Sequence, residues 1–243
     1  MNRAERLHGI HACFFDAYGT LFDFASAAKN CDAVPEDKRS ALTSLWREKQ
    51  LNYTWLRSLQ GLYVPFDDVT REALEFALDA LSLDAAKLKP RLMTLYFELP
   101  PFPEVRDVLE RLRSSGFKTA ILSNGSRSML ESLVSHAGLS GAFDAVLSVD
   151  AVGVFKPHPS VYQYALDVLG APANAVSFQS ANGWDAFAAS AFGMRVVWCN
   201  RNRQKRERLP GEPDFEVETL AELPALLAPP PPIERASPSP PRS

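Results

Sequence analysis

The sequence predicts an α/β protein built on a parallel, doubly wound sheet, with a helical subdomain inserted after the first strand. Five short apolar runs are bounded by polar, Gly or Pro residues, and the later runs alternate with single helical segments. Such runs are typical of strands buried on both faces, and their alternation with helices indicates parallel βαβ crossovers. A long stretch without a convincing strand, 24–102, follows the first run and predicts the insertion.

Each element follows from a local pattern. The expected strands are 11–15, 118–122, 145–148, 175–179 and 195–199. Between the later strands, apolar residues recur at helical spacing. The expected helices are 104–115, 127–137 and 160–169. A glycine follows each helix, at 116, 138 and 170, where glycine commonly ends a helix.

The inserted segment and the C-terminal end divide the chain. Helical patterns cover Pro35–Leu62, Asp67–Leu81 and Asp84–Leu95, and a connection of this length is too long for a simple crossover. We therefore predict a core domain from 1–23 and 103–227, a helical domain from 24–102 over the carboxyl edge of the sheet, and a tail from 228–243. Seven of the chain's 19 Pro lie in that tail, so we expect it to be disordered, with a ligand for an SH3-type domain as the alternative.

The charge balance and the cysteines exclude several functions. Lys and Arg number 26 against 29 Asp and Glu, and a net charge of −3 gives no long-range attraction for nucleic acid or an anionic membrane. No apolar stretch reaches the ~18 residues of a membrane span, and the first residues lack the apolar segment of a secretory signal. Three Cys, at 13, 31 and 199, suit reduced thiols, so we expect a cytoplasmic protein.

Polar clusters directly follow four of the expected strands. They are Asp16–Thr20, Ser123–Ser126, Lys156–Pro157 and Ser180–Asp185. The carboxyl ends of parallel strands meet at one edge of the sheet, which is where open α/β sheets bind their ligands. The sequence therefore predicts a site assembled from these four clusters.

The first cluster offers a nucleophile. Asp16 carries an ionised carboxylate that can form an ester intermediate, and the amides around Gly19 can form an anion-binding nest. Lys156 can hold Asp16 ionised and attract a bound anion. Taken singly, each residue has an ordinary structural explanation: Asp16 as a turn former, Gly19 as a turn and Lys156 as a surface charge.

The four clusters together resemble the motifs of the haloacid dehalogenase superfamily. DAYGTLFD at Asp16–Asp23, SNG at Ser123–Gly125, KP at Lys156–Pro157 and SANGWD at Ser180–Asp185 match them in order and spacing. The resemblance covers the chain except for the Pro-rich tail. It implies a Rossmann-like parallel sheet core with an inserted helical cap.

Two departures separate this chain from the phosphatases of that superfamily. Tyr18 stands where a phosphatase has its second aspartate, and Ser180 stands where it has an acidic metal ligand. Because Mg²⁺ usually needs carboxylate ligands, we expect no metal and no other cofactor. The same residues resemble the L-2-haloacid dehalogenases, and WREKQLNYTWLRSL at Trp46–Leu59 resembles their first cap helix. This similarity implies that Arg47 approaches the halogen, although its helical position alone favours a solvated face.

The resemblance assigns roles residue by residue. The implied catalytic residues are Asp16, Arg47, Ser123, Lys156, Ser180, Asn182 and Asp185. The implied substrate- and halide-binding residues are Ala17, Tyr18, Thr20, Leu51, Phe66, Asn124, Tyr162 and Trp184. Tyr162 has a second explanation of equal weight, as a core aromatic residue.

The expected activity is hydrolytic dehalogenation of short L-2-haloalkanoic acids, giving (R)-2-hydroxy acids with inversion through an ester on Asp16. Its partners are then a small 2-haloacid and a halide ion, and the resemblance suggests a homodimer formed through the cap. Fluoroacetate defluorination or opening of azetidine-2-carboxylate on the same scaffold is the main alternative. A superfamily phosphatase should have acids at positions 18 and 180, and a non-catalytic binding module should have lost Asp16, Lys156 or Asp185.

Overall fold

The computed structural model describes residues 6–230, and its core is a six-stranded parallel sheet. The strands are β1 (Ala12–Phe15), β2 (Lys118–Ser123), β3 (Ala145–Ser148), β4 (Val176–Ser180), β5 (Arg195–Cys199) and β6 (Phe215–Val217). Their order is β3-β2-β1-β4-β5-β6, and every neighbouring pair is parallel. The predicted α/β class with a parallel, doubly wound sheet is confirmed.

The central strand β1 sets the position of the site. All four of its residues are buried, and Phe15 pairs with Ile121 of β2 on one side and with Gln179 of β4 on the other. The chain fills the sheet outward from β1 first in one direction and then in the other. Such a reversal leaves a crevice at the carboxyl ends of the strands on either side of it, and Asp16 is the first residue beyond β1.

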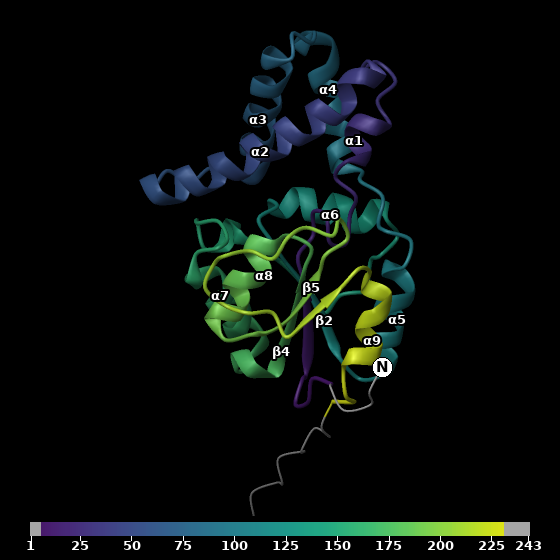
Figure 1. Cartoon of the computed structure of the whole chain (residues 1–243), viewed down its shortest axis with the longest axis vertical. Helices are drawn as coiled ribbons and strands as arrows, with labels where there is room; N and C mark the ends of the chain where they lie inside the picture. The colour runs from purple at the N-terminus through teal and green to yellow at the C-terminus, as the bar shows by residue number, and fades with distance from the viewer. Residues whose placement is uncertain (1–5, 231–243) are drawn as a thin grey trace, which may run out of the picture.

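Helices cover both faces of the sheet (Figure 1). The helices that come after the inserted segment are α5 (Val105–Ser114), α6 (Arg127–His136), α7 (Pro159–Leu169), α8 (Gly183–Phe192) and α9 (Leu223–Leu226). Figure 1 shows α5 and α9 on one side of the sheet and α7 and α8 on the other. The glycines after α5, α6 and α7 have φ values of 90°, 62° and 70°, a conformation that L side chains rarely adopt.

Three of these elements were not expected. Helix α8 is so rich in Ala and aromatic residues that it shows no polar face, and it packs against β4 and β5. Strand β6 has only three residues and α9 only four, which is too short for a periodic pattern.

Four helices between β1 and α5 form a separate layer beyond the carboxyl ends of the strands (Figure 1). This helical layer consists of α1 (Ser26–Lys29), α2 (Glu36–Gln60), α3 (Phe66–Ala80) and α4 (Ala85–Phe97). The two segments that connect it to the core run together, because Asp23 donates to the Pro100 carbonyl at 3.0 Å and Phe102 donates to the Leu21 carbonyl at 2.9 Å. The boundaries 24 and 102 remain a prediction.

The predicted C-terminal boundary of the core, at 227, also remains a prediction. Ala228, the first residue of the predicted tail, is buried and donates to the Leu7 carbonyl at 2.9 Å, so it packs on the core. The rest of the predicted disordered tail, from 231 onward, lies outside the described residues. Within 6–230, no helix is long and apolar enough to cross a membrane.

Candidate active site

Asp16 lies at the centre of the candidate site and is almost fully buried. Its Oδ1 accepts from Lys156 Nζ at 2.9 Å. Its Oδ2 accepts from Asn182 Nδ2 at 2.8 Å and from the Thr20 hydroxyl at 3.1 Å. Three donors from three different loops therefore fix the orientation of the carboxylate.

Lys156 bridges two buried carboxylates. Its ammonium donates to Asp16 at 2.9 Å and to Asp185 Oδ2 at 2.6 Å, and it also reaches the Leu122 carbonyl at 3.1 Å. Burial alone would lower the pKa of Lys156, but the two carboxylates outweigh burial and hold the pKa above its ordinary value. Lys156 is therefore a permanently charged group at neutral pH.

Asp185 is held on its other side by Tyr162. The Tyr162 hydroxyl donates to Asp185 Oδ1 at 2.7 Å, and both side chains are buried. Burial raises the pKa of Asp185, while Lys156 opposes that rise. Tyr162 is thus both a core aromatic residue and a polar partner of the site, which unites its two expected explanations.

The helical layer contributes Arg47 to the same cluster. Arg47 Nη2 donates to Asn182 Oδ1 at 3.1 Å, while the amide nitrogen of Asn182 donates to Asp16. The guanidinium carbon lies 5.0 Å from the centre of the Phe24 ring. Arg47 therefore points into the site, and the expectation from helical position alone, a solvated face, is wrong.

Ser123 and Asn124 close the end of β2. The Ser123 hydroxyl oxygen accepts from the Gly125 amide at 3.0 Å, a bond that does not use its hydroxyl hydrogen. Asn124 Oδ1 accepts from the Lys156 amide at 2.8 Å, which ties the lysine's backbone to this loop. Both residues are buried.

The loops after β1 and β4 are joined by short contacts. The Thr20 hydroxyl oxygen accepts from the Ala181 amide at 2.8 Å, and the Ser180 hydroxyl accepts from the Asn182 amide at 3.2 Å. The Ala17 carbonyl accepts from the amides that follow it and closes the turn after Asp16. Ser180 and Ala17 therefore shape the loops, and no side-chain hydrogen bond links either of them to Asp16 within the described residues.

An aromatic wall separates Asp16 from the interior of the helical layer. The Tyr18 ring lies 5.3 Å from that of Tyr96 and 5.5 Å from that of Phe66, measured between centroids. Within residues 6–230, the buried Tyr18 hydroxyl has no hydrogen-bond partner, and burial raises its pKa well above the ordinary value. Tyr18 is therefore a poor proton donor and serves as a wall.

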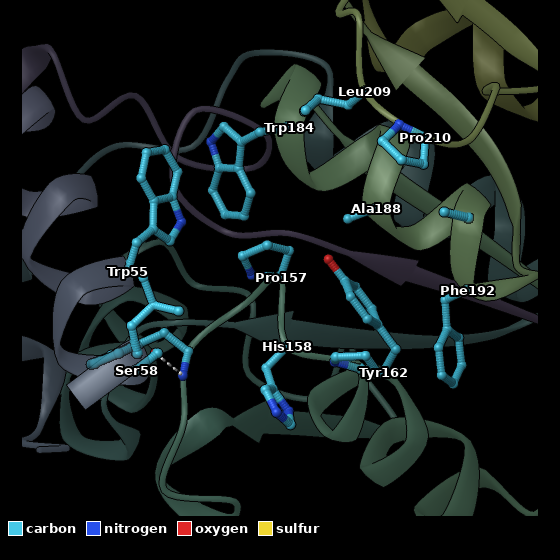
Figure 2. Close-up of a pocket in the computed structure, with 14 residues that line it drawn as sticks. Trp55, Ser58, Pro157, His158, Tyr162, Trp184, Ala188, Phe192, Leu209 and Pro210 are labelled. Carbon is cyan, nitrogen blue, oxygen red and sulfur yellow. Dashed lines mark hydrogen bonds between the residues drawn. The ribbon is translucent and has the colours of Figure 1, made fainter. Parts of the chain in front are cut away.

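Trp184 lies on α8 and Leu51 on α2. The Trp184 ring meets Trp55 of α2 edge-on at 5.6 Å, and both side chains line a cavity of about 730 Å³ (Figure 2). That cavity is lined mainly by apolar side chains, and its lining includes Tyr162 but neither Asp16 nor Arg47. Leu51 is half-buried on α2, one turn after Arg47.

The donor set does not fit the Mg²⁺ site that phosphatases of this superfamily imply. A phenol at 18 and a hydroxyl at 180 replace two carboxylates, and the remaining pair, Asp16 and Asp185, is already bridged by the Lys156 ammonium. In the described part of the chain, no three His, Cys, Asp or Glu side chains gather to hold a metal ion.

Sequence reasoning missed three residues behind Arg47. Gln50, Thr70 and Tyr96 are buried polar residues of the helical layer, linked to Arg47 through hydrogen bonds. Only the spacing of Gln50, three residues after Arg47 on one helix face, could have indicated one of them.

This fold and this cluster define a class. A family model for a "haloacid dehalogenase-like hydrolase" matches residues 10–193, and the chain belongs to that family. An (S)-2-haloacid dehalogenase of Pseudomonas sp. (strain YL) is 45% identical over 212 residues, covering 87% of this chain and 91% of that relative. Haloacetate dehalogenase H-2 of Moraxella sp. (strain B) is 39% identical over 220 residues, covering 90% and 98%.

A solved structure extends the similarity to three dimensions. The L-2-haloacid dehalogenase from Xanthobacter autotrophicus, in a crystal with chloropropionic acid covalently bound, superposes with a TM-score of 0.83 at 40% sequence identity. The match covers 89% of this chain and 98% of that one. The predicted resemblance to L-2-haloacid dehalogenases is confirmed.

Proposed function

We propose that this protein is an (S)-2-haloacid dehalogenase that converts short L-2-haloalkanoic acids, such as haloacetate and 2-halopropionate, to (R)-2-hydroxy acids. The observation that carries the proposal is the Asp16 carboxylate, held by Lys156 at 2.9 Å beside a tyrosine where a phosphatase would need an acid. A departing halide needs no proton, so a site without a general acid suits this reaction. The similarity to named (S)-2-haloacid dehalogenases supports the same conclusion.

In the first step, an Asp16 oxygen attacks C2 of the substrate from the side opposite the halogen. The new carbon–oxygen bond forms as the carbon–halogen bond breaks, the halide leaves with the electron pair, and C2 inverts. Arg47 offers N–H donors to the halide, Asn124 an amide, and Phe66 or Trp184 a ring edge. Leu51, Tyr18 and Trp184 exclude water, which strengthens these interactions.

The substrate carboxylate binds on the core side of the site. Ser123 can donate its hydroxyl hydrogen, and Lys156 supplies positive charge. The backbone amides after Asp16, in the turn Ala17–Thr20, form the remaining cradle. This placement leaves C2 in front of Asp16 and the halogen toward the helical layer.

In the second step, water attacks the carboxyl carbon of the Asp16 ester. Ser180 and Asn182 position that water, and Lys156 stabilises the oxyanion that develops. Water supplies one oxygen to Asp16 and one proton to the alcohol, and its other proton is released, which restores the enzyme. Asp185 and Tyr162 hold Lys156 in place through this step.

The test is halide release from L-2-chloropropionate, followed by chiral analysis of the lactate formed. We expect chloride release, (R)-lactate and no reaction of the D-enantiomer. Asp16→Asn, which keeps the size of the side chain, is the matched control and should be inactive. Retention of configuration, or hydrolysis of phosphate esters in place of halide release, would overturn the proposal.

We propose that the helical layer acts as a cap and carries a homodimer contact. Three large apolar side chains of the C-terminal part of α2 and its following turn are exposed: Leu56, Leu59 and Leu62. Leu59 alone is 85% exposed, and exposed apolar side chains that gather into a patch mark interaction sites. Light scattering should give the mass of a dimer, and Leu59→Asp should shift it toward the monomer.

We propose a cytoplasmic location for the enzyme. Cys13, Cys31 and Cys199 are all free and buried, an arrangement that suits a reducing compartment. Fractionation of cells that express the full chain, with antibody detection, would test this location. Recovery from a secreted or membrane fraction would contradict it.

A further inference from the structure

A buried polar network lies directly behind Arg47, on the side away from Asp16. Gln50 and Thr70 are fully buried, and Tyr96 is 2% exposed. Gln50 Oε1 accepts from Arg47 Nη1 at 2.7 Å and from the Tyr96 hydroxyl at 3.2 Å. Buried polar groups are costly unless they are bonded, so three such groups in the interior of the helical layer need an explanation.

Thr70 determines which end of the Gln50 amide faces Arg47. The Thr70 hydroxyl donates its hydrogen to the Phe66 carbonyl at 2.7 Å, one helical turn earlier. Its oxygen can then only accept, and it accepts from Gln50 Nε2 at 2.7 Å. The amide nitrogen of Gln50 therefore points to Thr70, and its carbonyl oxygen points to Arg47.

Arg47 is consequently held at both of its terminal nitrogens. Nη1 donates to Gln50 and Nη2 donates to Asn182 at 3.1 Å. Because the guanidinium is planar and rigid, two fixed donors set the direction of the other N–H groups. The partner behind Arg47, Gln50, is also neutral, so it orients the guanidinium without cancelling its charge. A glutamate in the same place would cancel that charge.

We propose that Gln50 is a positioning residue that aims Arg47 at the departing halide, with its own amide orientation set by Thr70. This inference rests on the proposed function, because it takes Arg47 as the halide partner. Gln50 touches neither substrate nor Asp16 and acts only through Arg47. The role predicts that loss of Gln50 lowers kcat most for the substrate with the poorest leaving group, chloride, and least for the substrate with the best, iodide.

The test compares steady-state kinetics on 2-chloro-, 2-bromo- and 2-iodopropionate. Gln50→Met keeps the length of the side chain without its hydrogen bonds, and Gln50→Glu keeps the shape but adds a charge that neutralises Arg47. For both variants we expect kcat on the chloride to fall about 10- to 100-fold, the scale of a misplaced catalytic group. The loss on the iodide should be several-fold smaller, and KM should change little.

Three threonine variants test the orientation of Gln50 and control for stability. Thr70→Val removes the hydroxyl that orients Gln50 and should show the same dependence on the halide, whereas Thr70→Ser should restore wild-type behaviour. Thr54→Val is the matched control, because Thr54 is also buried in α2 and bonds only a backbone carbonyl, that of Leu51. It should leave the halide dependence unchanged.

The outcomes distinguish failure of the positioning role from failure of the proposed function. An equal loss on chloride, bromide and iodide, or no loss in Gln50→Met and Thr70→Val, would overturn the positioning role while the proposed function stands. No halide release by the wild-type enzyme from any of the three substrates would overturn the proposed function and this inference together.

Discussion

Lys156 and Asp16 form a buried ion pair at 2.9 Å, although 140 positions separate them in the sequence. The pair exists because the parallel strands β1 and β2 end side by side. The Lys156 amide, in the loop after β3, bonds Asn124 at the end of β2, and this bond places Lys156 next to Asp16. A second carboxylate, Asp185, shares the same ammonium at 2.6 Å. One lysine is thus shared by two buried carboxylates at the centre of the site.

Lys156→Met should reduce activity and shift its pH dependence. Removal of the ammonium leaves Asp16 and Asp185 facing each other without a cation, and the pKa of Asp185, already raised by burial, should rise further. The acidic limb of the kcat profile should therefore move to higher pH, with kcat lower by about 10²-fold or more. Chemical denaturation should also show a loss of about 3–5 kcal/mol, as for other broken buried pairs.

The matched comparison for that variant is Tyr162→Phe, which removes only one hydrogen bond to Asp185. It should shift the acidic limb in the same direction by a smaller amount. A Lys156→Met enzyme whose acidic limb stays in place would show that neither carboxylate depends on the ammonium.

Arg47→Lys should be a poor enzyme although the charge is kept. Lysine carries its donors on one nitrogen without a planar fork, so it cannot reproduce the two bonds from separate nitrogens to Gln50 and Asn182 that fix the direction of the remaining N–H groups. We expect kcat to fall about 10²-fold or more, the effect of removing one transition-state donor. Measurement of the rate of chloride release gives kcat for the variant and the wild type. A variant rate near that of the wild type would show that Arg47 has only a structural role.

Activity should survive exhaustive chelation. Tyr18 and Ser180 supply no carboxylate, and Lys156 occupies the two that remain. Halide release measured after dialysis against EDTA should match the untreated enzyme within experimental error. Loss of activity with EDTA and its return with Mg²⁺ would favour a phosphatase-like chemistry in place of the dehalogenase.

Local patterns in the sequence were sufficient for five of the six strands, β1 to β5, and for the polar loops that follow four of the predicted strands. Apolar runs mark strands, and polar residues directly after them mark the carboxyl edge, so Asn124, Lys156 and Asp185 could be assigned from position and resemblance. The residues behind Arg47 could not. Gln50 meets Thr70 and Tyr96 only because α2, α3 and α4 pack together, and a polar residue on a helix ordinarily indicates solvent.

The role of Asp16 has two versions that a simple substitution cannot separate. Asp16 attacks carbon itself, or it activates a water that attacks, and both routes invert C2. Asp16→Ala should abolish turnover in either case. The oxygen of the product distinguishes them, because in the ester route the new hydroxyl oxygen comes from Asp16 and solvent oxygen enters the aspartate.

A single turnover in H₂¹⁸O, with enzyme in excess over L-2-chloropropionate, should therefore give unlabelled lactate and an ¹⁸O label in the peptide that carries Asp16. The ester route is favoured because a carboxylate fixed by Lys156, Asn182 and Thr20 has an effective molarity of roughly 10⁵ M or more against a positioned carbon. Mass spectrometry of the digested enzyme reads the label, and the peptide that carries Asp185 serves as the internal control that stays unlabelled. Labelled lactate in the first turnover would rule out the covalent route and leave Asp16 as a general base, with the fold and the substrate class unchanged.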